Sequence, residues 1–563
     1  MISLCRIFSI LLVTLCTFLS LLSGYARAYD EDLVDPGQLT FREPVANTSD
    51  EHIDPYTGHL GLAYTDLHLP GDGGLDLRIM RTYKSSRATD TAMVDSKLGY
   101  GWDISFGRVR RDGNFVTIEL QDGTTSVAVR ESLGSNYFLT KEFWKLYMPI
   151  GALPVLQLTD GTTITFGQGS LQGYLATEIR KNNNTITISY DSDRIDSVTY
   201  TAGGSSKTIS FHYAASGRRH LQSITWGSSS RQITYGYAAD NQAVTSVSLP
   251  GGDRWRYTYQ QQSINLHSAY IIRTVTTPWG STVTYDFATF SKPVGLSFKT
   301  QGSLASKQVS GRGLAGGTWN YDYSAETGYD ETIITDSCGR TTIYRFFGYG
   351  SPYSNNCYKY GLTMSKVVMN GGAHEITTEY EWDRLSMPIS SITHSVHALC
   401  SDISATYVPV LTEETITRGG KQYSTSYSNF DAYGSAGTIV EQGSNTRTTT
   451  VTYWHDASRN IVTDKPLTMT VTGSSAFPGT FTSTFSYYTN ASADANYYGE
   501  LKTAAPNGVT TTYHYDTRGN ISSISDANNH TTSYQWSHGT VSRITNPVYN
   551  IQRTINWDGT VAS

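Results

Sequence analysis

The stretch that decides the fold is residues 509–559, VTTTYHYDTRGNISSISDANNHTTSYQWSHGTVSRITNPVYNIQRTINWDG, near the end of the 563-residue chain. An aromatic residue closes a strand-like run three times there, at Tyr515, Trp536 and Trp557, with a spacing of 21 residues each time. A fixed period of this size is the signature of a repeat protein. The sequence therefore predicts that one small structural unit is used many times.

One unit of this repeat can be described residue by residue. In residues 509–515, Tyr513 and Tyr515 fall on one face of an alternating run, which predicts a strand. Asp516 and Gly519 belong to a tight turn, a second short strand follows at residues 521–525, and a second turn leads into the next unit. Each unit is therefore a β-hairpin, and such hairpins must stack because a single one is marginally stable in water.

Composition narrows the class of protein. Charged residues make up only 16% of the chain and the net charge is -6, which argues against a nucleic-acid partner because such a surface would be basic. The 40 Tyr and 51 Gly, with many Thr and Ser, favour an all-β extracellular protein over a disordered one. One short helical turn is expected, at residues 141–148.

Residues 1–28 are predicted to be a secretory signal peptide. Arg6 supplies a positive start, residues 7–22 are apolar, and Ala26-Arg27-Ala28 is the small-x-small pattern that precedes cleavage. An uncleaved membrane anchor is the alternative, because the apolar run is slightly long for a signal and slightly short for a span. We expect cleavage, a secreted or cell-surface protein, and no stable membrane insertion afterwards.

Signal cleavage leaves three cysteines, Cys338, Cys357 and Cys400. In an oxidising compartment Cys338 and Cys357, 19 residues apart, can pair across one repeat and leave Cys400 over. Buried free thiols are the alternative. A zinc site is not expected, because no Cys-x-x-Cys pair is present.

Residues 29–175 are predicted to form a β head domain. Its most specific block is residues 54–83, DPYTGHLGLAYTDLHLPGDGGLDLRIMRTY, in which apolar residues alternate on both sides of a Pro-Gly-Asp-Gly-Gly turn. This pattern is typical of a meander of strands with one apolar face. The polar residues of the block are expected at the surface or in turns: Asp54, His59, Asp66 and His68.

The head block resembles the region that opens the shell of bacterial Rhs and YD-repeat proteins. Four motifs appear in the same order: residues 57–60 (TGHL), 69–75 (LPGDGGL), 81–83 (RTY) and 99–102 (GYGW). In that family, repeat arrays wind into a spiral sheet that closes into a hollow shell, often around a C-terminal toxin. The resemblance implies an all-β fold of repetitive antiparallel hairpins forming a spiral sheet or partial hollow shell.

Residues 176–563 are predicted to be the YD-repeat array. Aromatic residues close strand runs along it at Tyr190, Tyr213, Tyr237, Tyr259, Phe287, Tyr323, Phe346, Trp382, Phe430 and Trp454. Wider spacings indicate loops, expected at residues 302–317, 349–358, 397–409 and 489–498. The structural repeat positions are best preserved at the end of the chain: Tyr513, Tyr515, Asp516, Gly519, Trp536 and Trp557.

A residue type repeated in every unit serves the repeat, so the Tyr-Asp pair is interpreted as structural. Tyrosine packs across strands, and the aspartate accepts backbone N–H groups in the following turn. Nucleophile-elbow, P-loop, zinc-protease and EF-hand motifs are absent from the sequence. We expect no enzyme activity, no cofactor and no metal. A hydrolase whose carboxylates meet only in the fold is the remaining catalytic alternative.

The predicted function is a secreted, non-catalytic scaffold that encloses or presents another polypeptide, as in Rhs-type toxin delivery or a surface protein. The expected partner is an enclosed or downstream effector polypeptide. The alternative is a cell-surface carbohydrate-binding or adhesion module that uses exposed Tyr and Trp. Toxin-carrying relatives end in a self-cleavage segment and an effector, whereas this sequence stops inside a unit, so we expect a fragment of a longer chain or a short relative without effector.

Overall fold

The computed structural model describes residues 51–562 except for residues 90–96, 113–114, 133, 170–172, 216–218, 228–230, 239–242, 265–266, 295–296, 312–315, 327, 349–356, 388–406 and 474–478. The expected signal peptide at residues 1–28 lies outside the described residues. Antiparallel strands make up most of what is described, and the predicted all-β class is confirmed. Short 3-10 turns lie between some of the strands: η2 (Asp72–Gly74), η3 (Ser85–Thr89) and η5 (Cys357–Lys359).

The first sheet is a four-stranded meander in the order β1 (Glu51–Ile53), β2 (Leu60–Leu69), β3 (Leu77–Lys84) and β4 (Trp102–Asp103). The alternating apolar residues predicted this meander. The two runs before the Pro-Gly turn are one strand, β2, whose register shifts between Thr65 and Leu67. A bulge of this kind turns one side chain out of the alternation.

The second sheet contains the other strands in chain order, and their bounds are β5 (Arg108–Asp112), β6 (Phe115–Glu119), β7 (Thr125–Arg130), β8 (Tyr137–Leu139), β9 (Lys145–Tyr147), β10 (Val155–Gln157), β11 (Thr163–Gln168), β12 (Tyr174–Lys181), β13 (Asn184–Asp191), β14 (Arg194–Ala202), β15 (Ser205–Tyr213), β16 (Leu221–Trp226), β17 (Gln232–Tyr237), β18 (Val244–Ser248), β19 (Arg254–Ile264), β20 (His267–Thr276), β21 (Thr282–Val294), β22 (Ser297–Ser310), β23 (Gly317–Ala325), β24 (Tyr329–Thr335), β25 (Thr341–Phe347), β26 (Thr363–Asn370), β27 (Ala373–Ser386), β28 (Tyr407–Arg418), β29 (Lys421–Phe430), β30 (Ala436–Gln442), β31 (Thr446–Tyr453), β32 (Pro466–Thr472), β33 (Thr480–Tyr487), β34 (Leu501–Pro506), β35 (Thr511–Tyr515), β36 (Ile521–Ser525), β37 (Thr531–Ser537), β38 (Thr540–Thr545) and β39 (Asn550–Gln552).

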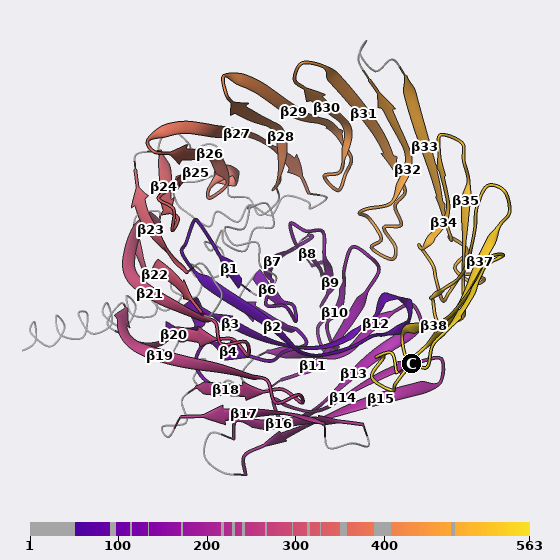
Figure 1. The fold of residues 1–563 in the computed structure, drawn as a ribbon, viewed down its shortest axis with the longest axis horizontal. Coiled ribbons are helices and arrows are strands. Elements are labelled where there is room, and N and C mark those ends of the chain that lie inside the picture. Colours follow the sequence, from indigo (N-terminus) through magenta and orange to yellow (C-terminus); the bar gives the residue numbers. More distant parts are fainter. Residues whose placement is uncertain are drawn as a thin grey trace, which may run out of the picture.

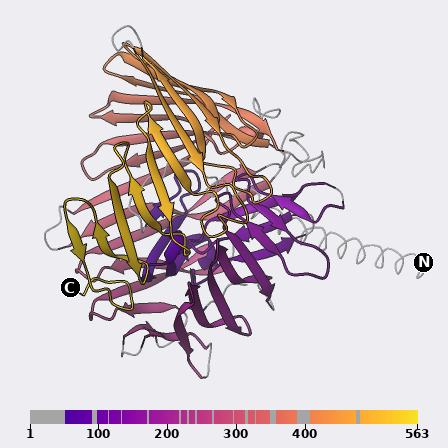
Figure 2. The same cartoon turned by 90° about the vertical axis from the view of Figure 1, so that its right-hand side faces the viewer.

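This sheet is closed at its start and then spirals. Each strand pairs antiparallel with its sequence neighbours, and β12 pairs in addition with β5, Tyr174 opposite Val109. From β13 onward the strands wind around the first sheet until the yellow C-terminal hairpins lie beside β13 to β15 (Figure 1). Figure 2 shows the same winding from the side. The predicted spiral of repeated hairpins is confirmed, and the expected domain boundary after residue 175 falls inside β12.

The repeated aromatic residues mark β-bulges. In eleven strand pairs the register shifts immediately before the aromatic residue, at Tyr190, Tyr213, Tyr237, Tyr259, Phe287, Phe346, Trp382, Tyr453, Tyr487, Tyr515 and Trp536. A bulge bends its strand and re-aims the side chain. The polar atom of the ring then reaches the preceding strand: Tyr515 Oη donates to Leu501 O at 3.0 Å and Trp536 Nε1 donates to Ile521 O at 2.7 Å.

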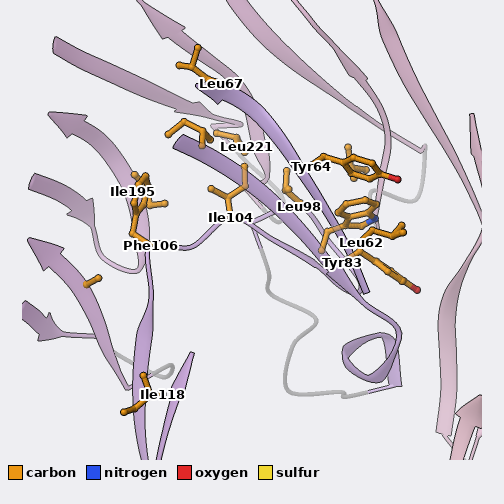
Figure 3. Packing of buried hydrophobic residues seen from close by; sticks show 14 of the residues in the cluster. Leu62, Tyr64, Leu67, Tyr83, Leu98, Ile104, Phe106, Ile118, Ile195 and Leu221 are labelled. Carbon is orange, nitrogen blue, oxygen red and sulfur yellow. The ribbon is translucent and has the colours of Figure 1, made fainter. Parts of the chain in front are cut away.

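The core lies between the first sheet and the spiral that covers it. Leu62, Tyr64 and Leu67 of β2 are buried, as are Ile195 and Leu221 of the second sheet, all in one apolar cluster. Figure 3 shows these side chains together with Ile104 and Phe106, which follow β4. The first sheet is therefore the inner layer, and the face of the spiral that contacts it is the inner face.

Strand pairing carries this inner face around the whole spiral, because directly opposed residues point to the same side of a sheet. Followed pair by pair, the inner face holds Tyr257, Tyr285, Tyr321, Ile334, Tyr344, Ile416, Tyr423, Ile439, Val471, Phe481, Ile524, Tyr534, Ile544 and Ile551. Tyr285 is 2% exposed, whereas Phe481 is 59% exposed. The first sheet thus covers the early part of the inner face and leaves the later part open.

Several local predictions were wrong. Residues 141–148 form no helix: Phe143 has φ 61° and residues 145–147 are β9, with Leu146 buried in an alternating pattern. The expected loop at residues 302–317 is largely strand, because β22 continues to Ser310. The run that ends at Trp557 is not a strand, and only Ile555 makes a bridge there, to Val561. The loop expected at residues 489–498 is present between β33 and β34.

Candidate functional site: the seam that closes the spiral

The turn between β2 and β3 projects from the first sheet to the place where the spiral closes. Gly73 and Gly74 have φ of 60° and 75°, a conformation that glycine adopts without strain. This turn buries Asp72, whose carbonyl oxygen accepts a hydrogen bond from Asn184 Nδ2 at 2.8 Å. The backbone N–H of Asp72 donates to the hydroxyl of Tyr200 on β14. The turn is thereby fixed against the first hairpins of the spiral.

A repeat turn near the end of the chain meets this loop from the other side. Asp516 Oδ1 accepts hydrogen bonds from the backbone N–H of Arg518 at 2.9 Å and of Asn520 at 3.0 Å, which sets the turn between β35 and β36. Gly519 has φ 85°, and a Cβ there would lie 2.8 Å from the backbone oxygen of Asn496 and 3.2 Å from the Cα of Gly73. Glycine is therefore required at this turn both for its conformation and for the close approach.

The two turns are joined by buried hydrogen bonds. Asn520 Nδ2 donates to Asp72 Oδ1 at 2.7 Å, and Asn520 Oδ1 accepts from the backbone N–H of Gly73 at 2.9 Å. Asn184 Nδ2 also donates to Arg518 O at 2.8 Å, so one amide group contacts both turns. We call this contact the seam: residues 70–74 and the first hairpins (residues 181–184 and 203–207) against residues 516–520 and 538–558.

A lysine and an ion pair extend the seam toward the C-terminus. Lys207 is 5% exposed, and its Nζ donates to Pro70 O at 3.4 Å and His538 O at 3.2 Å. The Lys207 Nζ also lies 5.9 Å from the ring centre of Trp557. Burial lowers the pKa of Lys207, and burial together with the neighbouring Lys207 lowers the pKa of His538. Arg231 and Asp558 form an ion pair at the far end.

The structure places the predicted repeat positions within and between hairpins. The carbonyl of Tyr513 accepts a hydrogen bond from Tyr488 Oη at 2.8 Å. Asp516, Gly519 and Trp557 lie at the seam, and Tyr515 and Trp536 bridge to the preceding strand. The repeat alone indicates that these positions are structural. It does not indicate that one of the repeat turns also closes the spiral.

Two acidic residues expected at the surface or in turns are buried. The side chain of Asp66 is 1% exposed, because Asp66 continues the inward alternation of Leu62 and Tyr64 up to the bulge and pairs with Arg81, with Oδ1 3.0 Å from Nη2. Tyr235 Oη also donates to Asp66 Oδ2 at 2.8 Å, which ties β2 to β17. Arg81 contacts the hydroxyl of Tyr257, and burial raises the pKa of Tyr257 to about 12. The surface expectation for Asp66 was therefore wrong.

Asp54 is also buried, although it does lie next to a turn. Its Oδ2 accepts from Thr57 Oγ1 at 2.6 Å, and its Oδ1 accepts from the backbone N–H of Tyr56 at 3.0 Å. His68 is exposed, as expected, and pairs with Asp76 at 2.7 Å.

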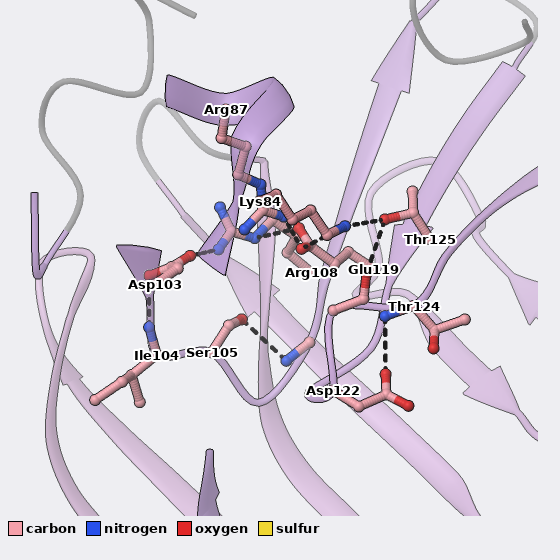
Figure 4. A network of polar contacts seen from close by, with 12 residues as sticks. Lys84, Arg87, Asp103, Ile104, Ser105, Arg108, Glu119, Asp122, Thr124 and Thr125 are labelled. Carbon is pink, nitrogen blue, oxygen red and sulfur yellow. Dashed lines mark hydrogen bonds and ion pairs between the residues drawn. The ribbon is translucent and has the colours of Figure 1, made fainter. Parts of the chain in front are cut away.

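A second buried polar cluster joins the two sheets near their start. Arg108 on β5 contacts Asp103 and lies with Nε 3.2 Å from Glu119 Oε2, and Lys84 Nζ lies 3.5 Å from Glu119 Oε1. Arg87 also pairs with Glu119 (Figure 4). Because these charges are buried and paired with one another, the cluster fixes the first sheet onto the second.

Neither cluster has the composition of a metal centre. Among the described residues, no group of three or more His, Cys, Asp or Glu side chains is placed to hold a metal ion. Cys338 is exposed and free in the structure, so the disulfide expected with Cys357 is not formed there; the side chain of Cys357 lies outside the described residues. In the part of the chain that the structure describes, no helix is both long and apolar enough to cross a membrane.

Residues 50–127 match a family model described as a domain of unknown function (DUF6531). No curated protein matches the chain. The matched segment contains all four motifs on which the resemblance to Rhs and YD-repeat proteins rests, which lie between residues 57 and 102.

Solved structures show weak overall similarity. A Photorhabdus luminescens Tc holotoxin pore is 10% identical with a TM-score of 0.37, and the match covers 89% of this chain and 25% of that one. The crystal structure of TcdB2-TccC3-TEV is 8% identical with a TM-score of 0.34, and the match covers 89% of this chain and 44% of that one. The N-terminal domain of the effector protein SpvB from Salmonella typhimurium strain LT2 is 11% identical with a TM-score of 0.18, covering 38% and 99%. The chain thus spans less than half of the first two structures.

Proposed function

We propose that the chain is a secreted, non-catalytic scaffold whose spiral sheet encloses or presents another polypeptide. The observation that carries this proposal is the inner face. Its early residues are buried against the first sheet, but Tyr423, Phe481 and Ile551 on the same face are 45%, 59% and 39% exposed. Apolar side chains left open on a concave face are typical of a surface that receives a partner.

The seam supports the same proposal. Buried hydrogen bonds across it hold the last hairpins against the first, so the open inner face looks into a space bounded by the sheet rather than into a flat surface. The resemblance of the head block to Rhs and YD-repeat proteins adds an effector polypeptide as the expected guest. Export by the predicted signal peptide belongs to this proposal.

Protease protection tests the proposal directly. The natural reading frame, including everything encoded after residue 563, is expressed and treated with thermolysin. We expect a guest polypeptide that survives digestion with the folded scaffold and is degraded once the scaffold is unfolded in urea. A guest digested equally fast with and without the scaffold would refute enclosure.

Cysteine labelling tests whether the guest occupies the inner face. Ile524→Cys places a thiol on the inner face and Ser523→Cys places one on the outer face of the same strand, β36, in a background without other cysteines. With the guest bound, a maleimide reagent is expected to label the outer position quickly and the inner position slowly. Equal labelling at both positions in the presence of guest contradicts a guest on this face.

A further inference from the structure

The open part of the inner face contains a groove of about 540 Å³ at the tips of β29 to β33. Its lining includes Tyr423 on one side, Phe481 on the other, and the β30–β31 tip between them. Four strand spacings separate β29 from β33, which sets the two rings roughly 19 Å apart across the sheet. This width suits an elongated ligand that spans several strands.

Glycine leaves both rings accessible. A Cβ at Gly443 would lie 2.9 Å from Cδ1 of Tyr423, and a Cβ at Gly479 would lie 3.3 Å from Cε2 of Phe481. Each ring therefore lies against a backbone that has no side chain, and the residues are 45% exposed (Tyr423) and 59% exposed (Phe481). The groove thus has two flat apolar platforms that face solvent.

The floor of the groove is polar but carries no net charge. Glu441 and Arg447 lie opposite each other on β30 and β31 and form a two-point ion pair, with Oε1 2.6 Å from Nη2. The pair is partly exposed, so it retains donor and acceptor capacity toward the groove. Because the two charges neutralise each other, the floor favours an uncharged ligand with many hydroxyl groups over an acidic or basic one.

The strands of the groove offer no free backbone edge. Each strand from β29 to β33 is paired on both sides, so an extended peptide cannot add itself as a further strand. Flat apolar platforms with a neutral hydrogen-bonding floor instead match a pyranose chain, whose rings have apolar faces and hydroxyl edges. We propose that this groove binds a neutral oligosaccharide, an activity that does not depend on enclosure of a polypeptide.

Calorimetric titration of the purified full chain with maltohexaose, cellohexaose and chitohexaose tests this site. We expect at least one of these neutral hexasaccharides to bind. The double substitution Tyr423→Leu and Phe481→Leu keeps apolar volume but removes the flat rings, and is expected to weaken binding about tenfold or more. Trp279→Ala, at an 81% exposed tryptophan outside the groove, is the matched control and is expected to bind as the unsubstituted chain does.

Circular dichroism and size-exclusion chromatography establish that the variants are folded, and Glu441→Gln provides a second variant that leaves both rings in place. Loss of affinity in Glu441→Gln as well as in the leucine variant supports the site. No binding of any of the three hexasaccharides overturns the proposal, as does unchanged affinity in the leucine variant. Binding of reduced, carboxymethylated α-lactalbumin that the leucine variant loses, without saccharide binding, would assign the groove to polypeptide instead.

Discussion

Asn520→Ala is the sharpest perturbation of the seam. The Asn520 side chain is almost fully buried and fills two hydrogen-bonding roles at once, as donor to Asp72 Oδ1 and as acceptor from the backbone N–H of Gly73. Alanine cannot form either hydrogen bond, so Asp72 Oδ1 and the backbone N–H of Gly73 lose their partner in the repeat turn. We expect the turn at residues 70–74 to separate from the repeat turn far more often than in the unsubstituted protein.

The size of the effect follows from the two lost bonds. An unpaired buried polar group costs about 1–3 kcal/mol, and water entering the opened seam recovers part of this cost. We expect the free energy of local opening to fall by about 2–3 kcal/mol, which corresponds to a roughly 30- to 150-fold faster exchange of the Gly73 amide hydrogen. Such an effect is local, because the hairpins on either side keep their own strand pairing.

Hydrogen–deuterium exchange with mass spectrometry measures this directly in peptides that cover residues 70–76. His530→Ala is the matched control, because His530 ends the next turn, is exposed, and contacts the aspartate of its own turn, away from residues 70–74. We expect His530→Ala to leave exchange at residues 70–76 unchanged. Equal exchange in the two variants would falsify the assignment of Asn520 as the joint between the head and the array.

Three further substitutions test the core, the loops and the repeat. Asp66→Asn leaves a buried arginine without its counter-charge and is expected to lower the unfolding free energy by about 3–5 kcal/mol in urea, whereas Asp191→Asn at an exposed ion pair costs less than about 1 kcal/mol. At Asp456, burial opposes ionisation, but hydrogen bonds from the serine two residues on and from a tyrosine outweigh it and lower the pKa to about 2. Its contribution to stability is therefore complete above about pH 4 and lost as the pH falls through 2, on the order of 1 kcal/mol, and Asp456→Asn is expected to flatten this part of the melting profile. Tyr515→Phe removes the bond to the preceding strand and is expected to cost about 1 kcal/mol, against no measurable change for the half-exposed Tyr549→Phe.

Each of these has a result that contradicts it. A loss below 1 kcal/mol for Asp66→Asn means that the buried pair is not held in water-free surroundings. An unchanged acid limb of the melting profile in Asp456→Asn shows that other carboxylates set the acid sensitivity. Equal melting temperatures for the two tyrosine variants would show that the hydrogen bond from Tyr515 Oη to Leu501 O does not stabilise the protein.

The local structure of the array was largely predictable from the sequence. Alternation and turn residues in residues 509–537 place β35, β36 and β37 to within a residue or two, because each strand uses only its own pattern and its nearest neighbour. The aromatic period was equally visible. What the period did not reveal is that most of these aromatic residues follow a bulge, since a bulge is a property of two paired strands and not of one.

The contacts that close the fold could not be predicted in the same way. Asp66 lies where the alternation of Leu62 and Tyr64 changes to that of Leu67 and Leu69, so the sequence pattern assigns it to either face, and only the register opposite β3 shows that it points inward. Asp72 and Asn520 are 448 positions apart in the chain, and other repeat turns are also built on an aspartate, as at Asp336 and Asp431. Which of these turns meets the head depends on the accumulated twist of all the strands between them, which no local pattern contains.

The seam also fixes an order of events. Hairpins of the array form between neighbours in sequence, so they can assemble as the chain emerges, N-terminus first. The turn at residues 70–74 is made early, yet its partner at residues 516–520 arrives only after more than four hundred further residues have been added. Throughout that interval the interior has an open side. A guest that is to be enclosed must therefore enter, or be threaded in, before the last hairpins dock, so closing the spiral serves as the final step of loading.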